Sequence, residues 1–299
     1  GTRRPHHGKT RDPMALDDAN WFTEVCDEGG TAFSLRIREK LHEEQSDYQH
    51  IAIYETETYG RLMVIDGFIM LTDRDNFLYH EMMSHPALYT HPAPRRVLII
   101  GGGDCGTLRE VLKHPEVERA DQVEIDERVT QLAEEYFPTL TDANDDERAG
   151  LHFGDGIEWV RQAEDDSIDV IIVDSTDPIG PAEGLFDVPF YKECARALSS
   201  GGIFVQQSES PLYHTRLLGE IHNGLRDAGF LDVLSLHFPQ PVYPSGWWSA
   251  TMARTDDLIG EPREDDIRDR PFTTQYYNYG THMGALAAPE FFYRSLNGG

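Results

Sequence analysis

The chain of 299 residues contains few cysteines and no long apolar run. Its three cysteines, Cys26, Cys105 and Cys194, lie far apart and lack metal-ligand spacing, so the sequence predicts no metal site and indicates a reducing compartment. No apolar run approaches the roughly 20 residues that a membrane-spanning helix needs. The first residues are basic and polar and lack the apolar core of a secretory signal. A cytoplasmic protein without a membrane partner is expected, with residues 1–13 as a tag remnant or a disordered arm.

Positive charge is scarce as well. Lys and Arg number 26 against 53 Asp and Glu, which gives a net charge of -27, and only four of the bases are lysine. Such a chain repels phosphate, so nucleic acid is not expected as a partner, whereas a cationic substrate would be attracted. An acid excess with little lysine is also typical of a solvated, salt-adapted surface. We ascribe most of the negative charge to such a surface and expect only a few of the acids to line a pocket.

The pattern of apolar residues divides the chain into two regions. Residues 31–90 hold short alternating segments with hairpin signals at Gly60 and at Asp66-Gly67, which is typical of an antiparallel β meander. Residues 76–91 have helical spacing. From residue 95 onward, strands, glycine turns and helices alternate, with late antiparallel strands near 243–254. This order predicts an α/β protein with a doubly wound, mainly parallel sheet over 91–299 and a small antiparallel β domain over 14–90.

A glycine-rich loop follows the first strand of the second region. The stretch "VLIIGGGDCG" places four glycines between this strand and a helix, where they permit a tight turn and close approach of a ligand. The next strand ends at Glu124, whose carboxylate could accept hydrogen bonds from ribose hydroxyls. "GDG" after the third strand offers Asp155 for an adenine amino group. Each alone could be a turn residue, but their place at one carboxyl edge of the sheet predicts an adenosine site.

Asp104 lies inside this glycine loop. Its carboxylate would repel a diphosphate and weaken the helix N-terminus that normally binds one. It suits an ammonium or a sulfonium group instead. The loop therefore favours an adenosyl sulfonium compound over NAD or ATP.

Five stretches resemble, in order and spacing, the polyamine aminopropyltransferase family, and within it the spermidine synthases. They are "VLIIGGGDCGTLREVLKHPEVE", "VEIDERV", "GDGIEWV", "DVIIVDSTDPIGPAEGLF" and "YPSG". The resemblance runs from about Trp21 to the C-terminus. It implies an N-terminal β domain on a methyltransferase-like Rossmann domain, assembled as a homodimer or homotetramer. It also implies transfer of an aminopropyl group from decarboxylated S-adenosylmethionine, a co-substrate, to a diamine such as putrescine, with no cofactor.

The resemblance also implies roles for single residues. Asp174 matches the catalytic acid, and Trp21 is a further candidate for the diamine channel. The positions that match contacts to the nucleoside co-substrate are Gln49, Asp104, Glu124, Asp155, Gly156 and Pro181. Those that match the amine side are Tyr79, His80, Asp177 and Tyr243. Taken alone, the two tyrosines would be core or interface aromatics and His80 a structural histidine.

Two positions depart from the family pattern. The family often has glycine where this chain has Cys105, and an acid where it has Asn76. Cys105 would tighten the loop if its backbone needs a positive φ. Asn76 removes one acid near the amine-side segment, so the choice of acceptor stays open.

The acid at the end of the strand "DVIIVD" has a chemical reason. An alkylammonium has a pKa of about 10 and must lose a proton before its nitrogen can attack the carbon beside a sulfonium. Asp174 can hold the ammonium and accept that proton as general base, although alone it could be a helix cap. Asp104 and Asp174 would also repel the carboxylate of intact S-adenosylmethionine. A methyltransferase and a non-catalytic polyamine-binding subunit are the rival readings, and cadaverine, agmatine and spermidine the rival acceptors.

Overall fold

The computed structural model describes residues 16–176, 178 and 180–296, and within it an antiparallel sheet forms the N-terminal part. Its five strands run in sequence order: β1 (Trp21–Cys26), β2 (Thr31–Gln45), β3 (His50–Thr56), β4 (Arg61–Ile65) and β5 (Phe68–Thr72). The turn between β4 and β5 has a positive φ at both Asp66 (51°) and Gly67 (84°), as a tight hairpin requires. The predicted meander is confirmed, and β1 is a strand that the sequence pattern missed.

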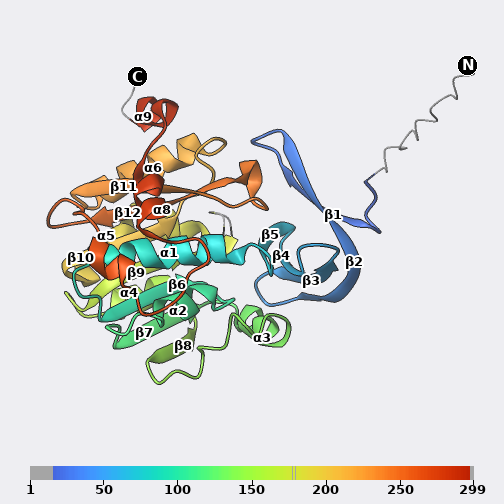
Figure 1. The fold of residues 1–299 in the computed structure, drawn as a ribbon, viewed down its shortest axis with the longest axis horizontal. Helices are drawn as coiled ribbons and strands as arrows, with labels where there is room; N and C mark the ends of the chain where they lie inside the picture. Colours follow the sequence, from blue (N-terminus) through green and yellow to red (C-terminus); the bar gives the residue numbers. More distant parts are fainter. Residues whose placement is uncertain (1–15, 177, 179, 297–299) are drawn as a thin grey trace, which may run out of the picture.

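The second sheet has seven strands and is mainly parallel (Figure 1). Its order is β11 (Asp232–Pro239), β12 (Trp247–Arg254), β10 (Leu198–Gln207), β9 (Ile168–Asp174), β6 (Arg96–Gly101), β7 (Arg119–Glu124) and β8 (Ala149–Phe153). The strands from β10 to β8 pair in parallel, whereas β12 pairs antiparallel with β10 and β11. The predicted doubly wound sheet with a late antiparallel strand is therefore confirmed.

Helices cover both faces of this sheet because its strands are apolar on both sides. In β6, Val97 and Ile99 pack into one core cluster, and Leu98 and Ile100 into the other. The first cluster lies beneath α1 (Asn76–Thr90), α2 (Gly106–Val111), α7 (Glu264–Arg268) and α8 (Tyr279–Leu286). The second lies beneath α4 (Gly156–Gln162), α5 (Val188–Ala197) and α6 (Thr215–Asp227). The C-terminal α9 (Glu290–Leu296) contacts α6.

The two sheets are joined by a shared core. Helix α3 (Glu127–Tyr136) follows β7 and packs Val129, Leu132 and Ala133 against strands β3, β4 and β5. At the other side, the turn after β1 approaches the segment after β10: a Cβ atom on Gly29 would lie 2.7 Å from the ring of Tyr213. The N-terminal sheet therefore lies beside the carboxyl edge of the seven-stranded sheet (Figure 1).

Candidate active site between the two sheets

A cavity of about 410 Å³ lies where the two sheets meet. From the seven-stranded sheet, residues at the ends of β6, β7 and β9 line this cavity. From the N-terminal sheet, residues of β1, β4 and β5 line it. Eight acids contribute to its wall: Glu24, Asp27, Glu28, Asp104, Glu124, Asp155, Asp174 and Glu209. No lysine or arginine is found among the described residues of this wall. Such a cavity attracts cations and repels anionic ligands.

Asp174 ends strand β9 in the middle of this wall and is 8% exposed. The Tyr79 hydroxyl donates to its Oδ1 at 2.6 Å, and the Thr107 hydroxyl donates to its Oδ2 at 2.7 Å. Burial and the nearby charge of Asp104 raise the pKa of Asp174 to about 6, against the opposing effects of His80 and the two hydroxyl donors. A carboxyl with this pKa is mostly ionised at neutral pH and can accept a proton there.

The glycine loop packs directly on this strand end. Gly101 has a φ of 80°, and a Cβ atom there would lie 2.1 Å from the backbone oxygen of Asp174. The amide of Gly102 donates to that same oxygen at 2.7 Å. Only glycine permits this approach, which fixes the loop against β9.

Cys105 also has a positive φ, of 70°. The expectation that this residue occupies a position suited to glycine is met. The side chain is fully buried, and its Sγ accepts from Gln122 Nε2 and from Asn144 Nδ2, each at 3.5 Å. Burial raises the pKa of the thiol to about 12, so Cys105 is a packing group rather than a nucleophile.

Asp104 and His80 form an ion pair at the loop. His80 Nε2 lies 3.0 Å from Asp104 Oδ1, and His80 Nδ1 lies 3.1 Å from the Asn76 side-chain oxygen. Burial opposes a charged imidazole, but the carboxylate of Asp104 outweighs it and raises the pKa of His80. With an acceptor at each ring nitrogen, His80 donates from both. His80, which the resemblance places on the amine side, is not among the described residues that line the cavity, and it contacts the cavity wall at Asp104.

The other predicted nucleoside contacts lie along the neighbouring strand ends. Glu124 ends β7 and is 9% exposed, and burial followed by the charges of Asp126, Asp174 and Asp104 raises its pKa to about 8. Asp155 is exposed and caps α4 by accepting from the Ile157 amide at 2.9 Å. Gln49 reaches the same cavity from the turn before β3 and donates to Asp126 at 3.0 Å.

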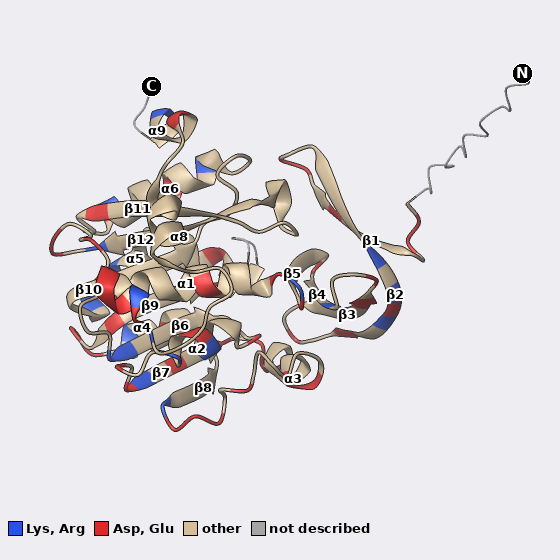
Figure 2. Ribbon diagram, in the orientation of Figure 1, with Lys and Arg blue, Asp and Glu red and all other residues tan. Residues whose placement is uncertain are grey.

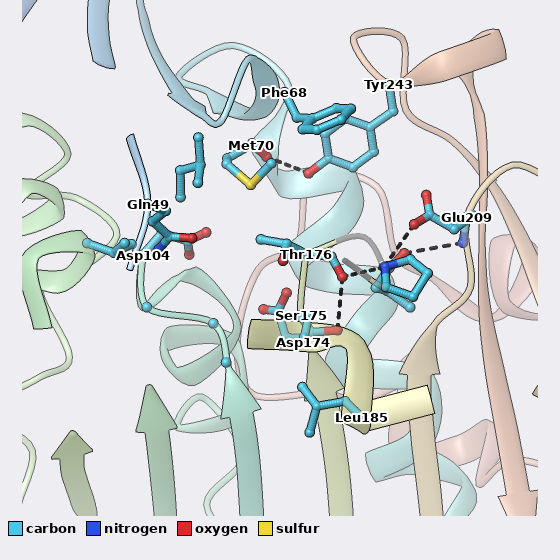
Figure 3. Close-up of a pocket in the computed structure, with 18 of the residues that line it drawn as sticks. Gln49, Phe68, Met70, Asp104, Asp174, Ser175, Thr176, Leu185, Glu209 and Tyr243 are labelled. Carbon is cyan, nitrogen blue, oxygen red and sulfur yellow. Dashed lines mark hydrogen bonds between the residues drawn. The ribbon is translucent and has the colours of Figure 1, made fainter. Parts of the chain in front are cut away.

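Two of the predicted amine-side residues, Tyr79 and Tyr243, line the cavity together with Asp174, and Figure 3 shows Tyr243 in its wall. The rings of Tyr79 and Tyr243 meet edge to face, 5.8 Å apart, and the Tyr243 hydroxyl donates to the backbone oxygen of Met70. Trp21 lies on β1 outside the lining of the cavity, with the Arg36 guanidinium 5.7 Å from its ring. Asp177 and the side chain of Pro181 lie outside the described residues.

Three buried residues of the site were not identified from the sequence. Glu24 on β1 is 4% exposed, and its Oε1 accepts from the Ile69 amide at 2.6 Å. Glu209 follows β10, is 2% exposed and has a φ of 67°. Thr107 is fully buried and contacts Asp174. In Figure 3, Gln49 and Asp104 lie at one end of the cavity and Glu209 at the other, with Asp174 between them in this view.

Glu209 carried a usable sequence signal, since "GIFVQQ" is a parallel strand that ends at the same edge as Asp174. Glu24 and Thr107 had no such signal in the sequence. Glu24 lies in the other sheet, and Thr107 resembles any residue in the first turn of a helix. Among the described residues, no group of three or more His, Cys, Asp or Glu is arranged to hold a metal ion. No described helix is long and apolar enough to cross a membrane.

Comparison with known proteins gives the same family along almost the whole chain. Residues 76–261 match a family model described as the spermine/spermidine synthase domain. Residues 20–73 match one described as the spermidine synthase tetramerisation domain. The polyamine aminopropyltransferase of Thioalkalivibrio sulfidiphilus is 63% identical over 286 residues, which are 95% of this chain and the whole of that protein. That of Halorhodospira halophila is 58% identical over 271 residues, 90% of this chain and 98% of that protein.

Solved structures agree with the sequence relatives. A crystal structure of spermidine synthase in complex with the transition-state analogue AdoDATO has a TM-score of 0.90 and 34% identity, and the match covers 94% of this chain and 96% of that one. Spermidine synthase from Thermotoga maritima has a TM-score of 0.87, also at 34% identity, with 93% and 94% covered. These matches confirm the predicted fold class. The family models and relatives of this similarity show that the chain belongs to the polyamine aminopropyltransferases, enzymes that transfer an aminopropyl group.

Proposed function

We propose that this enzyme is a spermidine synthase, which transfers the aminopropyl group of decarboxylated S-adenosylmethionine to putrescine with Asp174 as general base. The observation that carries the proposal is the buried carboxylate of Asp174, with a pKa raised to about 6, in a cavity lined by eight acids. Both substrates are cations, which the acids of this cavity attract. The spermidine synthase complex with AdoDATO supports the choice of co-substrate.

The nucleoside occupies the ends of β6, β7 and β8 in this proposal. Glu124 accepts from the ribose hydroxyls, and Asp155, Gly156 and Gln49 surround the adenine. Asp104 binds the ammonium of the aminopropyl group. His80 and the Gly106 amide both contact its Oδ1, so we assign Oδ2 to the ligand. Pro181, like Asp177 on the amine side, keeps its role by resemblance alone.

The diamine lies on the other side of Asp174. Tyr79 and Tyr243, whose rings contact edge to face at 5.8 Å, lie beside the attacking amine. Glu209 and Glu24 are buried acids of the same wall, so we assign the distal ammonium of the acceptor to them. Acids in this wall in addition to Asp174 favour an acceptor with two amines over one with a single amine.

The chemical step needs one proton transfer and one displacement. The bound ammonium gives a proton to Asp174, which frees the nitrogen lone pair. This lone pair attacks the aminopropyl carbon beside the sulfonium, a C–N bond forms, and the C–S bond breaks with its electron pair going to sulfur. The products are a secondary ammonium and the neutral thioether methylthioadenosine. Holding the two reactants side by side supplies a large part of the acceleration.

A homodimer or homotetramer is part of the proposal. The match of residues 20–73 to a family model described as a tetramerisation domain supports it. Sedimentation of the purified protein measures the state directly, and a monomer at micromolar concentration would contradict it.

The proposal is tested by turnover of decarboxylated S-adenosylmethionine against putrescine, cadaverine, agmatine and spermidine. We expect putrescine to give the highest kcat/KM. Asp174→Asn should lower turnover by about 10²-fold or more, the usual scale for a lost general base, while nucleoside affinity stays because Glu124 and Asp155 remain. Asp187→Asn, which changes an acid at the start of α5 outside the cavity, is the matched control.

If the enzyme prefers another amine, the assignment of putrescine as acceptor is wrong, but Asp174 can still be the general base. Near-normal turnover of the Asp174→Asn enzyme would remove Asp174 from its role. Methyl transfer from intact S-adenosylmethionine would replace the reaction itself.

A further inference from the structure

Asp174 receives a hydrogen bond on each of its two oxygens. Tyr79 from α1 donates to Oδ1 at 2.6 Å, and Thr107 from the first turn of α2 donates to Oδ2 at 2.7 Å. Thr107 is fully buried, and it is not among the described residues that line the cavity. Its hydroxyl therefore touches the site only through the carboxylate of Asp174.

We propose that Thr107 is a positioning residue for aminopropyl transfer: its hydroxyl fixes the Oδ2 atom of Asp174 and keeps this carboxylate ionised for the incoming ammonium. The inference rests on the proposed role of Asp174 as general base. It assigns to Thr107 no contact with either substrate.

The geometry supports the orienting part of this role. A carboxylate held by one donor can still rotate about its Cβ–Cγ bond, whereas donors on both oxygens fix its plane. Oδ2 is further confined by the glycine loop, because a Cβ atom on Gly102 would lie 3.0 Å from it. A general base has to direct a lone pair at the proton that it accepts, so a fixed plane favours transfer.

The charges around Asp174 support the second part. It faces Tyr79 and His80 from α1, Asp104 from the glycine loop, Glu124 from β7 and Tyr243 from the segment before η2 (Pro244–Gly246). Burial and Asp104 raise the pKa of Asp174 to about 6, while His80, Tyr79 and Thr107 lower it. Without the Thr107 donor, the ionised form loses a stabilising hydrogen bond and the pKa rises further.

The test compares Thr107→Val with Thr107→Ser in the full-length enzyme. Valine keeps the shape of threonine and removes the donor, whereas serine keeps the donor. The measurement is the pH profile of kcat/KM for putrescine at saturating decarboxylated S-adenosylmethionine. We expect the acid limb of the Thr107→Val enzyme to move to higher pH by about one unit, the effect of one hydrogen bond to a charged group. Thr107→Ser should keep the wild-type limb.

A second variant guards against misfolding. Thr107→Ala also removes the hydroxyl but adds no bulk, so it should give the same shift as valine. A wild-type acid limb in both the valine and the alanine enzymes would overturn the inference. Equal loss of activity in the serine, valine and alanine enzymes, without any shift, would also overturn it, because that pattern belongs to a merely structural residue.

Failure of this inference and failure of the proposed function give different results. If Asp174→Asn abolishes turnover while Thr107→Val leaves the limb in place, Asp174 remains the base and only the role of Thr107 is wrong. If Asp174→Asn turns over normally, the general base itself has been assigned wrongly.

Discussion

At the scale of single residues, we expect the charge of Asp104 to distinguish decarboxylated from intact S-adenosylmethionine. It lies in the glycine loop, paired with His80 at 3.0 Å, and lines the acid cavity. Asp104→Asn keeps an oxygen acceptor for His80 and the Gly106 amide but removes the charge. We expect it to bind decarboxylated S-adenosylmethionine more weakly and intact S-adenosylmethionine more tightly, because the carboxylate of the latter is no longer repelled.

Calorimetry of both ligands measures this effect as the ratio of their dissociation constants. The preference for the decarboxylated compound, expressed as this ratio, should fall by about tenfold. This change corresponds to roughly 1.4 kcal/mol in the difference between the two binding free energies. Asp121→Asn, an acid on β7 outside the cavity, should leave it unchanged. An unchanged ratio in the Asp104→Asn enzyme would count against exclusion of the intact compound by this acid.

Single residues of the site differ in how far the sequence could identify them. Asp104, Glu124 and Asp174 follow buried strands, and the carboxyl edge of a parallel sheet brings strand ends together, so their neighbourhood could be predicted. The contact between Thr107 and Asp174 could not, because it depends on the path of the glycine loop. The pairing of His80 with Asp104 likewise depends on how α1 packs against the glycine loop.

At the scale of elements, the contact of α1 with α2 places His80 over a glycine. A Cβ atom on Gly106, the first residue of α2, would lie 2.1 Å from the His80 ring. Gly106→Ala should therefore displace the imidazole from Asp104 and reduce turnover by about 10²-fold, the scale of a 1 Å misplacement in a catalytic site.

A matched glycine provides the control for this helix variant. Gly219 lies inside α6 with no atom within 4 Å of an added Cβ, so Gly219→Ala should keep full activity and raise stability by about 0.5–1 kcal/mol. Steady-state kinetics and thermal melting of both variants separate the two effects. Wild-type kinetics in the Gly106→Ala enzyme would show that His80 has no role in the reaction.

The elements themselves followed the sequence closely where a long apolar pattern existed. The helix expected over 76–91 extends from Asn76 to Thr90, and the strand expected at "DVIIVD" extends from Ile168 to Asp174. The weak patterns were missed. Helix α7 has only five residues, and α9 exposes the apolar side chains Phe291 and Tyr293, so neither has a clear apolar stripe.

For the whole molecule, acids are spread over both parts of the chain (Figure 2). With a net charge of -27, these acids repel one another in the folded state, and they attract a dication toward the cavity. At 0.01 M salt the Debye length is about 30 Å, so even distant acids contribute, whereas salt screens both effects. We therefore expect the melting temperature to rise with salt and the KM for putrescine to rise with it.

Thermal melting and steady-state kinetics between about 0.05 and 2 M NaCl test these two expectations. Over this range, salt goes from partial to nearly complete screening of the surface charges. KCl should act like NaCl, because only ionic strength enters. A melting temperature that is flat or falls with salt would show that the acid excess is no salt adaptation. A flat KM would show that the acids of the cavity alone recruit the diamine.

The eight acids in the wall of the cavity also bear on what happens after the reaction. Under the proposed chemistry, one proton goes to Asp174 and the remaining positive charge ends on the polyamine, because the sulfonium becomes an uncharged thioether. The ionised acids of the wall then attract one product and do not attract the other. Methylthioadenosine leaves without crossing a charge barrier, whereas the polyamine dissociates against the pull of several carboxylates. Accumulated polyamine then slows the enzyme by delaying product release rather than by slowing bond formation.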